Sequence, residues 1–347
     1  MTEDTGGRSS ARWIAIRVWA ALLASLALTA CATRDRPPPA GAANGPRLTD
    51  TAWIAEDGRR LPLTRWSGEG EPRGIVLALH GFSEHRGVFF ALAPHLAAAG
   101  YHVYAYDQRG FGETATRGFW AGESALVDDA RSAFGLLHQR YPDTPVHLLG
   151  HSMGGAIANL AVTGDEAIRP ASTILVAPAI HGWDTLPWIQ RIALRVSHWI
   201  APAARPRQSW GRAVVDIRVT DDPTIARLQA RDPHILRSVR IDMVHGVVDL
   251  MDAGIERIAD VPPPALILYG ERDDIIPRTA GCEMFRRLAD TPPGVGLRLY
   301  PNGYHYLTRD RQRGRTIADI RAWLADAPPP DAATVVTATA AARRVCD

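Results

Sequence analysis

Short runs of apolar residues recur between residues 48 and 324, and longer segments with a helical spacing of apolar positions separate most of them. Continuous apolar strands that alternate with helices are typical of a mostly parallel sheet covered by helices on both faces, so we predict an α/β fold. The expected strands are Thr51–Ala55, Leu61–Trp66, Ile75–Leu79, Tyr101–Tyr106, Val146–Leu149, Thr173–Val176, Ala265–Tyr269 and Leu297–Tyr300. The expected helices are Val88–Ala99, Glu123–Arg140, Met153–Val162, Ala280–Ala289 and Gly314–Leu324.

One segment interrupts this alternation. Residues 181–259 carry helical and irregular patterns without a convincing strand, and we expect them to form a helical cap between two core segments, 48–180 and 260–325. Within the cap segment, one helical stripe is apolar. Such a stripe either packs into the core or forms the roof of a substrate pocket, and both interpretations stay open. The stripe consists of Leu186, Ile189, Ala193, Val196 and Ile200.

The first thirty residues have the pattern of an export signal. Three arginines precede Val18–Ala30, an uncharged apolar run that is too short for a comfortable membrane span. The run ends in Leu28-Thr29-Ala30-Cys31, which resembles the bacterial lipoprotein signal. This resemblance implies removal of residues 1–30, lipidation of Cys31, and anchoring at the cell envelope, at the outer membrane facing the periplasm. The alternative is ordinary cleavage and secretion as a soluble protein.

Both ends of the expected fold are flanked by segments of low complexity. Residues 31–47 are rich in Pro, Gly and Ala and predict a flexible tether, and residues 326–347 predict a disordered tail. An oxidising compartment would permit a disulfide between Cys282 and Cys346. We do not expect one, because Cys282 falls in a predicted helix and Cys346 in the predicted tail.

Composition narrows the classes of partner. The 347 residues carry a formal net charge of +2, which gives no reason to expect nucleic-acid binding. A hydrophobic content of 46% is ordinary for a globular protein. The sequence has neither a His-Glu-x-x-His helix nor paired Cys and His ligands, so we expect no metal and no cofactor.

The sequence Gly150-His151-Ser152-Met153-Gly154 directly follows the expected strand Val146–Leu149 and precedes an expected helix. Strand, Gly-x-Ser-x-Gly and helix in this order are the signature of a nucleophile elbow, a tight turn that exposes a serine hydroxyl at the sheet edge. Gly150 and Gly154 would leave room for the turn and for close packing of helix on strand. Ser152 is therefore the candidate nucleophile.

A serine hydroxyl needs a base, usually a histidine that a carboxylate orients. In folds with a nucleophile elbow the partners follow in the order Ser, Asp, His, each just after a strand. Asp273 follows the expected strand Ala265–Tyr269 and is the candidate carboxylate, with Asp274 and Glu271 as competing choices. His305 follows the expected strand Leu297–Tyr300 and is the candidate base.

The negative charge that develops during acyl transfer needs two donors aimed at it. We assign these to the backbone N–H of Met153, directly after the nucleophile, and of Phe82, in the loop after Ile75–Leu79. Gly81 allows close approach of that loop to substrate. His80 and His85 are expected to brace the loop by hydrogen bonds.

These motifs together resemble the α/β-hydrolase superfamily, and within it the monoacylglycerol lipase and lysophospholipase group. The resemblance spans residues 50–325 and implies a helical cap after the sixth strand. Two departures are the bulky Phe82 beside the oxyanion loop and the unmatched cap. The motifs that carry the resemblance are His80-Gly81 with Glu84-His85, Asp107-Gln108-Arg109-Gly110-Phe111-Gly112, Gly150–Gly155, Gly270–Asp273 and Tyr300–His305.

The resemblance implies a serine hydrolase that cleaves monoacylglycerol- or lysophospholipid-like esters through an acyl-enzyme. Its expected partners are a small lipid-like ester and, through Cys31, a membrane. A short-chain carboxylesterase or thioesterase with the same triad is the alternative within enzymes. A non-catalytic envelope binding protein that kept the fold is the alternative from another class.

Overall fold

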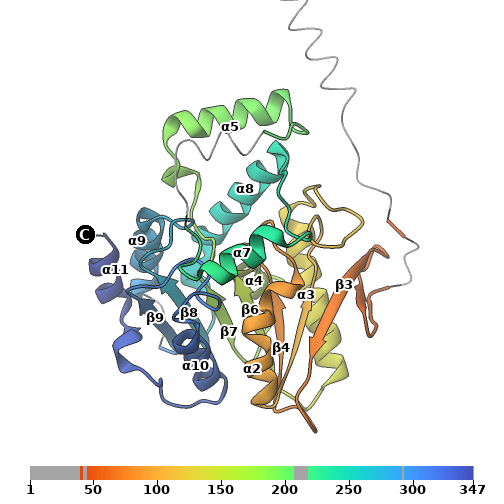
Figure 1. The fold of residues 1–347 in the computed structure, drawn as a ribbon, viewed down its shortest axis with the longest axis vertical. Coiled ribbons are helices and arrows are strands. Elements are labelled where there is room, and N and C mark those ends of the chain that lie inside the picture. Colours follow the sequence, from red (N-terminus) through yellow and green to blue (C-terminus); the bar gives the residue numbers. More distant parts are fainter. Residues whose placement is uncertain (1–39, 42–44, 207–217, 291–292, 347) are drawn as a thin grey trace, which may run out of the picture.

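A computed structural model of the chain describes residues 40–41, 45–206, 218–290 and 293–346. Its centre is one sheet with the strand order β1-β2-β3-β5-β4-β6-β7-β8-β9-β10 (Figure 1). The strands from β5 through β4 to β9 pair in parallel, and antiparallel strands complete both edges. The strands are β1 Arg47–Leu48, β2 Ala52–Ile54, β3 Arg60–Trp66, β4 Gly74–Leu79, β5 Tyr101–Tyr106, β6 Val146–His151, β7 Thr173–Val176, β8 Ala265–Gly270, β9 Val295–Tyr300 and β10 Val335–Val336.

Helices cover both faces of the sheet. Alternate side chains of each central strand point to opposite faces, and both sets are largely apolar and buried, so both faces need cover. In β4, Ile75 and Leu77 belong to one core cluster, and Val76 belongs to the other. The first cluster includes residues of α3 Glu123–Arg140, α4 Met153–Val162, α8 Ile241–Arg257 and α9 Arg278–Arg287. The second includes residues of α2 Ala93–Ala98 and α10 Arg313–Leu324, and of the 3₁₀ helix η1 Arg86–Ala91. The predicted α/β architecture is confirmed.

The segment between β7 and β8 is helical where it is described. It contains the 3₁₀ helix η2 Trp183–Thr185, α5 Trp188–Ile200, α7 Pro223–Arg231 and α8. Helix α8 packs against α3 and α4 and contributes Met243 and Leu250 to the core. Helix α5 lies apart from the sheet and contacts α8 (Figure 1).

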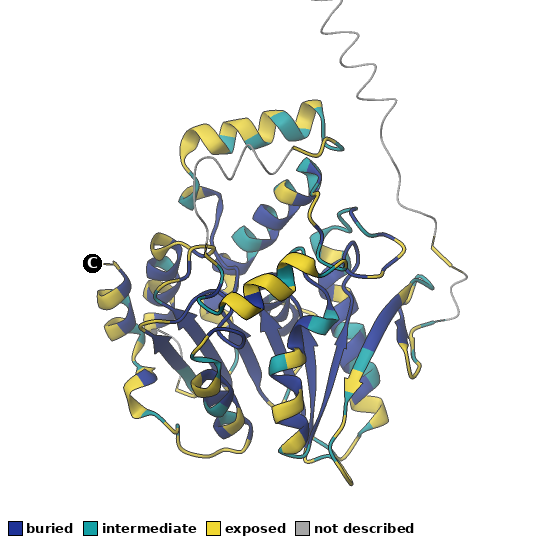
Figure 2. Cartoon of the chain, in the orientation of Figure 1, coloured by how far each residue is buried: buried dark blue, intermediate teal, exposed yellow. Residues whose placement is uncertain are grey.

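The apolar stripe of α5 is exposed, which neither interpretation of the sequence anticipated. None of the 13 residues of α5 is buried (Figure 2). Ile189 is 61% exposed and Val196 47% exposed. The half-buried residues of the helix are Arg191, Leu194, Ser197 and His198. Arg195 lies over the ring of Trp183 at 4.8 Å, and the rings of His198 and His245 stack at 4.1 Å. The core-packing interpretation is therefore wrong for this helix.

The C-terminal segment is ordered, contrary to the predicted tail. Strand β10 pairs antiparallel with β9, and helix α11 Ala338–Cys346 packs on α9. The alanines of α11 favour helix formation, but the low complexity of residues 326–347 led to the prediction of a disordered tail. Ala341 and Val345, one helical turn apart, are its buried residues.

A disulfide joins Cys282 of α9 to Cys346 at the end of α11, so the expectation of two unpaired cysteines is wrong. The pairing follows from the packing of α11 on α9, which the sequence analysis did not foresee. The signal segment, Cys31 and most of the tether lie outside the described residues. Within the described ranges, no helix combines the length and apolar character that crossing a bilayer requires.

Candidate active site

The backbone around Ser152 forms a sharp turn between β6 and α4. Strand β6 ends at His151, Ser152 adopts φ 55° and ψ −120°, and α4 begins at Met153. A positive φ is rare for a residue with a side chain and persists only where the surrounding structure imposes it. A Cβ on Gly150 would lie 2.1 Å from the carbonyl oxygen of Gly154, and one on Gly154 would lie 2.1 Å from that of Leu79. Both glycines are therefore required by backbone approach.

The structure brings Ser152, His305 and Asp273 together at the carboxyl ends of β6, β9 and β8. The Nε2 atom of His305 lies 2.9 Å from Oγ of Ser152. The Nδ1 atom of His305 lies 2.7 Å from Oδ2 of Asp273. All three residues are buried, which shields their hydrogen bonds from water.

Backbone donors fix the orientation of Asp273. Its Oδ1 accepts hydrogen bonds from the N–H groups of Ile275 at 2.8 Å and Ile276 at 2.9 Å, which leaves Oδ2 for the imidazole. The competing carboxylates make other contacts. Asp274 is exposed and accepts from the backbone N–H of Arg218, and Glu271 pairs with Arg344.

The two backbone groups assigned to the oxyanion hole belong to Phe82, in the loop after β4, and to Met153, the first residue of α4. A Cβ on Gly81 would lie 3.1 Å from Cβ of Ser152, so the loop after β4 runs directly beside Ser152. The N–H groups of Phe82 and Met153 donate to no acceptor in the part of the chain that the structure describes. The ring of Phe82 packs edge-on against Phe111 at 5.4 Å, which holds this loop against the core.

His80 fastens the start of this loop. Its Nε2 accepts from the backbone N–H of Gln108 at 3.0 Å, and the Gln108 side chain donates to the carbonyl oxygen of His80 at 2.6 Å. Its Nδ1 donates to the carbonyl oxygen of Gly81 at 2.8 Å. Burial lowers the pKa of His80 to about 4, so the ring is neutral and keeps this pattern of one donor and one acceptor.

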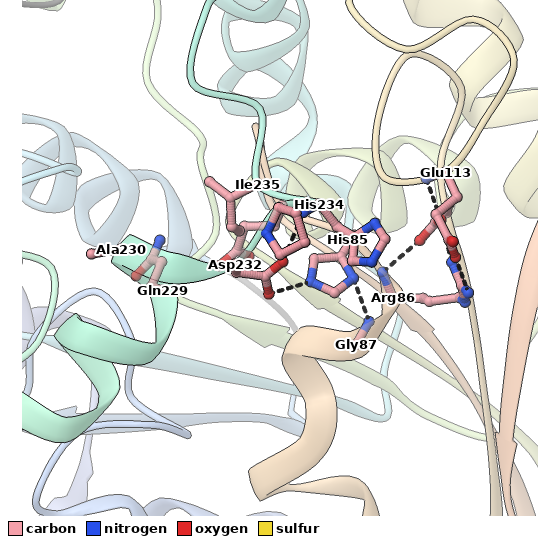
Figure 3. Close-up of polar contacts among 12 residues, drawn as sticks. His85, Arg86, Gly87, Glu113, Gln229, Ala230, Asp232, His234 and Ile235 are labelled. Atoms are coloured by element: carbon pink, nitrogen blue, oxygen red, sulfur yellow. Dashed lines mark hydrogen bonds and ion pairs between the residues drawn. The ribbon is translucent and has the colours of Figure 1, made fainter.

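His85 connects the end of the same loop to the cap (Figure 3). Its Nδ1 accepts from the N–H of Gly87 at 3.2 Å, and its Nε2 lies 2.8 Å from Oδ2 of Asp232, directly after α7. Arg86, the next residue, is held by the carboxylates of Asp107 and Glu113. A surface cavity of about 520 Å³ lies alongside, between η1 and α7, and no member of the Ser152 constellation lines it.

A buried charge network that the sequence analysis missed lies behind the constellation. Glu84 contacts His151 at 3.1 Å and the N–H of Gly81 at 3.1 Å, and it pairs with Arg309 at 2.5 Å. Glu84 belongs to the motif His80-Gly81 with Glu84-His85, but the sequence gives no reason to assign it a contact with His151 or Arg309. Nothing in the sequence marks Arg309, because the two partners are separated by 225 positions.

The described residues contain no group of three or more His, Cys, Asp or Glu side chains that could hold a metal ion. The arrangement suits nucleophilic attack by a serine hydroxyl on an acyl carbon.

The family model "Serine aminopeptidase, S33" matches residues 70–312. The chain belongs to this family. A monoacylglycerol lipase from Mycolicibacterium smegmatis is 26% identical over 235 residues, which cover 67% of this chain and 81% of that protein. The resemblance to monoacylglycerol lipases that the sequence motifs indicated is confirmed.

Solved structures agree on the fold. A soluble variant of monoglyceride lipase from Saccharomyces cerevisiae, in complex with a substrate analog, aligns with a TM-score of 0.67 at 22% identity, over 83% of this chain and 98% of that one. A thermostable carboxyl esterase from Bacillus coagulans aligns with a TM-score of 0.64 at 22% identity, over 81% and 98%. The α/β-hydrolase fold is confirmed, and the prediction of an enzyme that hydrolyses carboxylic esters agrees with these matches.

Proposed function

We propose that this protein is a serine esterase in which Ser152, His305 and Asp273 form the catalytic triad. The observation that carries the proposal is the continuous chain of contacts from Oγ of Ser152 through both ring nitrogens of His305 to Oδ2 of Asp273. Each member of this chain stands at the end of a parallel strand, where ligands of open α/β sheets bind.

In the proposed mechanism, Oγ of Ser152 attacks the ester carbonyl while Nε2 of His305 accepts the hydroxyl proton. Asp273 accepts the hydrogen bond from Nδ1–H and stabilises the imidazolium that forms. The N–H groups of Phe82 and Met153 donate to the oxyanion of the tetrahedral intermediate. His305 then gives its proton to the leaving alcohol. A water molecule activated by His305 releases the acid from the acyl-enzyme.

Replacement of the nucleophile tests this proposal. Ser152→Ala should lower kcat by about 10⁴-fold or more, because the members of a triad act as a unit. A fluorophosphonate probe should label the wild-type protein at Ser152 and leave the variant unlabelled. Hydrolysis of a p-nitrophenyl ester by the variant at the wild-type rate would exclude the triad. Absence of labelling in the wild-type protein would favour the non-catalytic envelope binding protein.

For the substrate, we propose monoacylglycerol- or lysophospholipid-type esters presented at a lipid surface. The relatives named as monoacylglycerol lipases support the acyl-glycerol class. The exposed apolar face of α5 supports presentation at a surface. On this face, Trp188 is 64% exposed and Trp199 is 84% exposed. Tryptophan is enriched at the interface between membrane and water.

The exposed apolar side chains of α5 are better accommodated by a lipid surface than by water. The helix exposes large apolar side chains to the outside and contacts the protein partly through Arg195 and His198, which suits a helix lying in a membrane interface. The lipid surface is therefore the proposed occupant of this face.

A vesicle assay separates this proposal from the short-chain esterase alternative. Trp199→Ser should weaken binding to phosphatidylglycerol vesicles and reduce hydrolysis of monooleoylglycerol in them, while hydrolysis of soluble p-nitrophenyl acetate is retained. Phe90→Ser removes an equally apolar side chain, 46% exposed, from outside α5 and is the matched control. Activity confined to acetyl or butyryl esters would favour the short-chain carboxylesterase or thioesterase, and vesicle binding unaffected by Trp199→Ser would exclude the docking role.

We further propose that Cys31 is lipidated and attaches the enzyme to the bacterial cell envelope. The lipoprotein-type signal supports this location, and so does the disulfide, since disulfides persist in oxidising compartments such as the periplasm. Cys31→Ser should move the protein from the membrane fraction to the soluble fraction. Unchanged fractionation would contradict lipidation, and a wild-type protein found in the medium would favour secretion.

A further inference from the structure

The C-terminal segment, residues 331–346, lies beyond residues 70–312, the part of the chain that the family model matches. It comprises a 3₁₀ turn at Ala332–Thr334, strand β10 and helix α11. Its contacts fall on β9, which leads to His305, and on α9, which follows the loop of Asp273 (Figure 1). The segment is therefore an addition to the family-matched region that packs beside the site.

Helix α11 contacts the loop that carries Asp273. The guanidinium of Arg344 pairs with Glu271 at 2.6 Å, two positions before Asp273. Arg278, in the first turn of α9, donates to the carbonyl oxygens of Arg344 at 2.9 Å and Val345 at 3.3 Å. These bonds satisfy carbonyl groups at the C-terminal end of α11, which its own turns leave unpaired. The loop from β8 to α9 is thus held at both ends by α11.

The start of the segment contacts the strand that leads to His305. Val335 and Val336 pair with Arg298 and Leu297 of β9. Oγ1 of Thr334 donates to Oδ2 of Asp319 at 3.2 Å, and the same oxygen accepts from the Tyr300 hydroxyl at 2.6 Å. Tyr300 is the last residue of β9 and precedes the turn to His305.

The disulfide between Cys282 and Cys346 makes this attachment covalent. Cys282 lies on α9 directly after the Asp273 loop, and Cys346 is the last residue of α11. A link that closes a long loop restricts separation of its ends, so α11 cannot leave α9 while the bond is intact.

We infer that residues 331–346 act as a positioning clamp, which holds the loops of Asp273 and His305 in register and is locked by the Cys282–Cys346 disulfide. The clamp touches no reacting atom and acts through Glu271, Arg278 and Tyr300. This inference rests on the proposed triad, since it concerns the alignment of that triad.

Reduction of the folded enzyme tests the lock. Dithiothreitol converts the disulfide to two thiols and is itself oxidised to a cyclic disulfide, and Cys346 is exposed to it. A small misplacement of catalytic groups costs up to about 10²-fold, so we expect kcat to fall roughly fivefold or more. KM should stay within about twofold, because substrate binding is not the affected step. Reoxidation should restore kcat, and near-ultraviolet circular dichroism should show that the reduced protein stays folded.

Substitutions at Arg344 test the clamp without touching the cysteines. Arg344→Ala should lower kcat, and Arg344→Lys, which keeps the positive charge beside Glu271, should recover part of the loss. Arg343→Ala is the matched control, because Arg343 is exposed and pairs with no carboxylate among the described residues. A purely structural role would lower thermal stability equally in Arg344→Ala and Arg344→Lys with kcat unchanged.

Wild-type kcat in both the reduced enzyme and Arg344→Ala would overturn the clamp. If reduction unfolds the protein, the kcat values of the Arg344 variants alone decide whether the clamp acts on the site. Failure of the clamp and failure of the triad remain distinguishable. Ser152→Ala abolishes turnover if only the clamp is wrong, and it retains turnover if the triad itself is wrong.

Discussion

Oε2 of Glu84 lies 3.1 Å from Nδ1 of His151, so the loop that carries Phe82 contacts the residue before the nucleophile. Nε2 of His151 in turn lies 3.2 Å from the carbonyl oxygen of His305. Burial alone would raise the pKa of Glu84, but the charges of Arg309 and His151 outweigh it and hold that pKa well below its ordinary value. One ionised, buried carboxylate therefore connects the loop that carries Phe82 with His151, which precedes Ser152 and contacts the backbone of His305.

Removal of the Glu84 charge should destabilise the fold. Glu84→Gln leaves the buried Arg309 without its anion, and breaking a buried pair from one side typically costs about 3–5 kcal/mol. Urea unfolding at pH 7 measures this loss. The double variant Glu84→Gln/Arg309→Met removes both charges and should lose less stability than Glu84→Gln alone. Equal losses in the single and double variants would show that the unpaired cation is not the cause.

A methyl group at Gly81 should impair turnover more than folding. Its Cβ would lie 2.8 Å from Oε2 of Glu84 and 3.1 Å from Cβ of Ser152, so the oxyanion loop must shift. Loss of one oxyanion donor costs about 10²–10³-fold in kcat, and we expect Gly81→Ala to approach the lower value. Gly135→Ala is the control, because no atom outside its own helix lies within 4 Å of its Cβ. That control should keep wild-type kcat and gain about 0.5–1 kcal/mol from reduced chain entropy.

Two adjacent aspartates provide a test of the assigned carboxylate. Asp273→Asn should lower kcat by about 10⁴-fold, because an amide orients the wrong tautomer of the base. Asp274→Asn should stay within a few-fold of wild type, because that side chain is exposed and accepts a hydrogen bond from the backbone N–H of Arg218 instead of contacting His305. Steady-state hydrolysis of p-nitrophenyl butyrate measures both. The reverse order of effects would assign the triad carboxylate to Asp274.

The sheet and the Ser152 constellation could be predicted because their signals are local. A run such as Val146–Leu149 indicates a strand by itself, and the ends of parallel strands must meet at one edge, which places Ser152, Asp273 and His305 near one another. The bonds of Glu84 to Arg309 could not be predicted in this way. They depend on side chains 225 positions apart, and neither residue marks the other in the sequence.

The outer elements were mispredicted for a different reason. Periodicity shows that α5 has an apolar side, but it does not show which side meets the protein, and here His198 and Arg195 make those contacts. In the C-terminal segment, composition masked a short helix whose burial comes from α9 rather than from its own pattern. Both errors concern tertiary packing, which local patterns do not encode.

Buried histidines should make the fold sensitive to acid. Burial lowers the pKa of His147 to about 4, at the end of β6 opposite Ser152. The unfolded chain, with a His pKa near 6.5, binds more protons than the folded chain between pH 6.5 and 4, so stability falls as pH falls through that window. For His147 the loss between pH 7 and 5 is about 2 kcal/mol.

Urea unfolding at pH 7 and pH 5 checks this contribution. His147→Gln, which can keep a hydrogen bond to Oγ of Ser172, should lose less stability over that interval than the wild-type protein does. His95→Gln is the control, because His95 is exposed on α2 and its replacement should leave the pH dependence unchanged. If His147→Gln shows the full wild-type loss between pH 7 and 5, protonation of this residue does not contribute to acid unfolding. The dependence would then come from other titrating groups, of which His181, with its pKa lowered to about 4 by burial, is the next to replace.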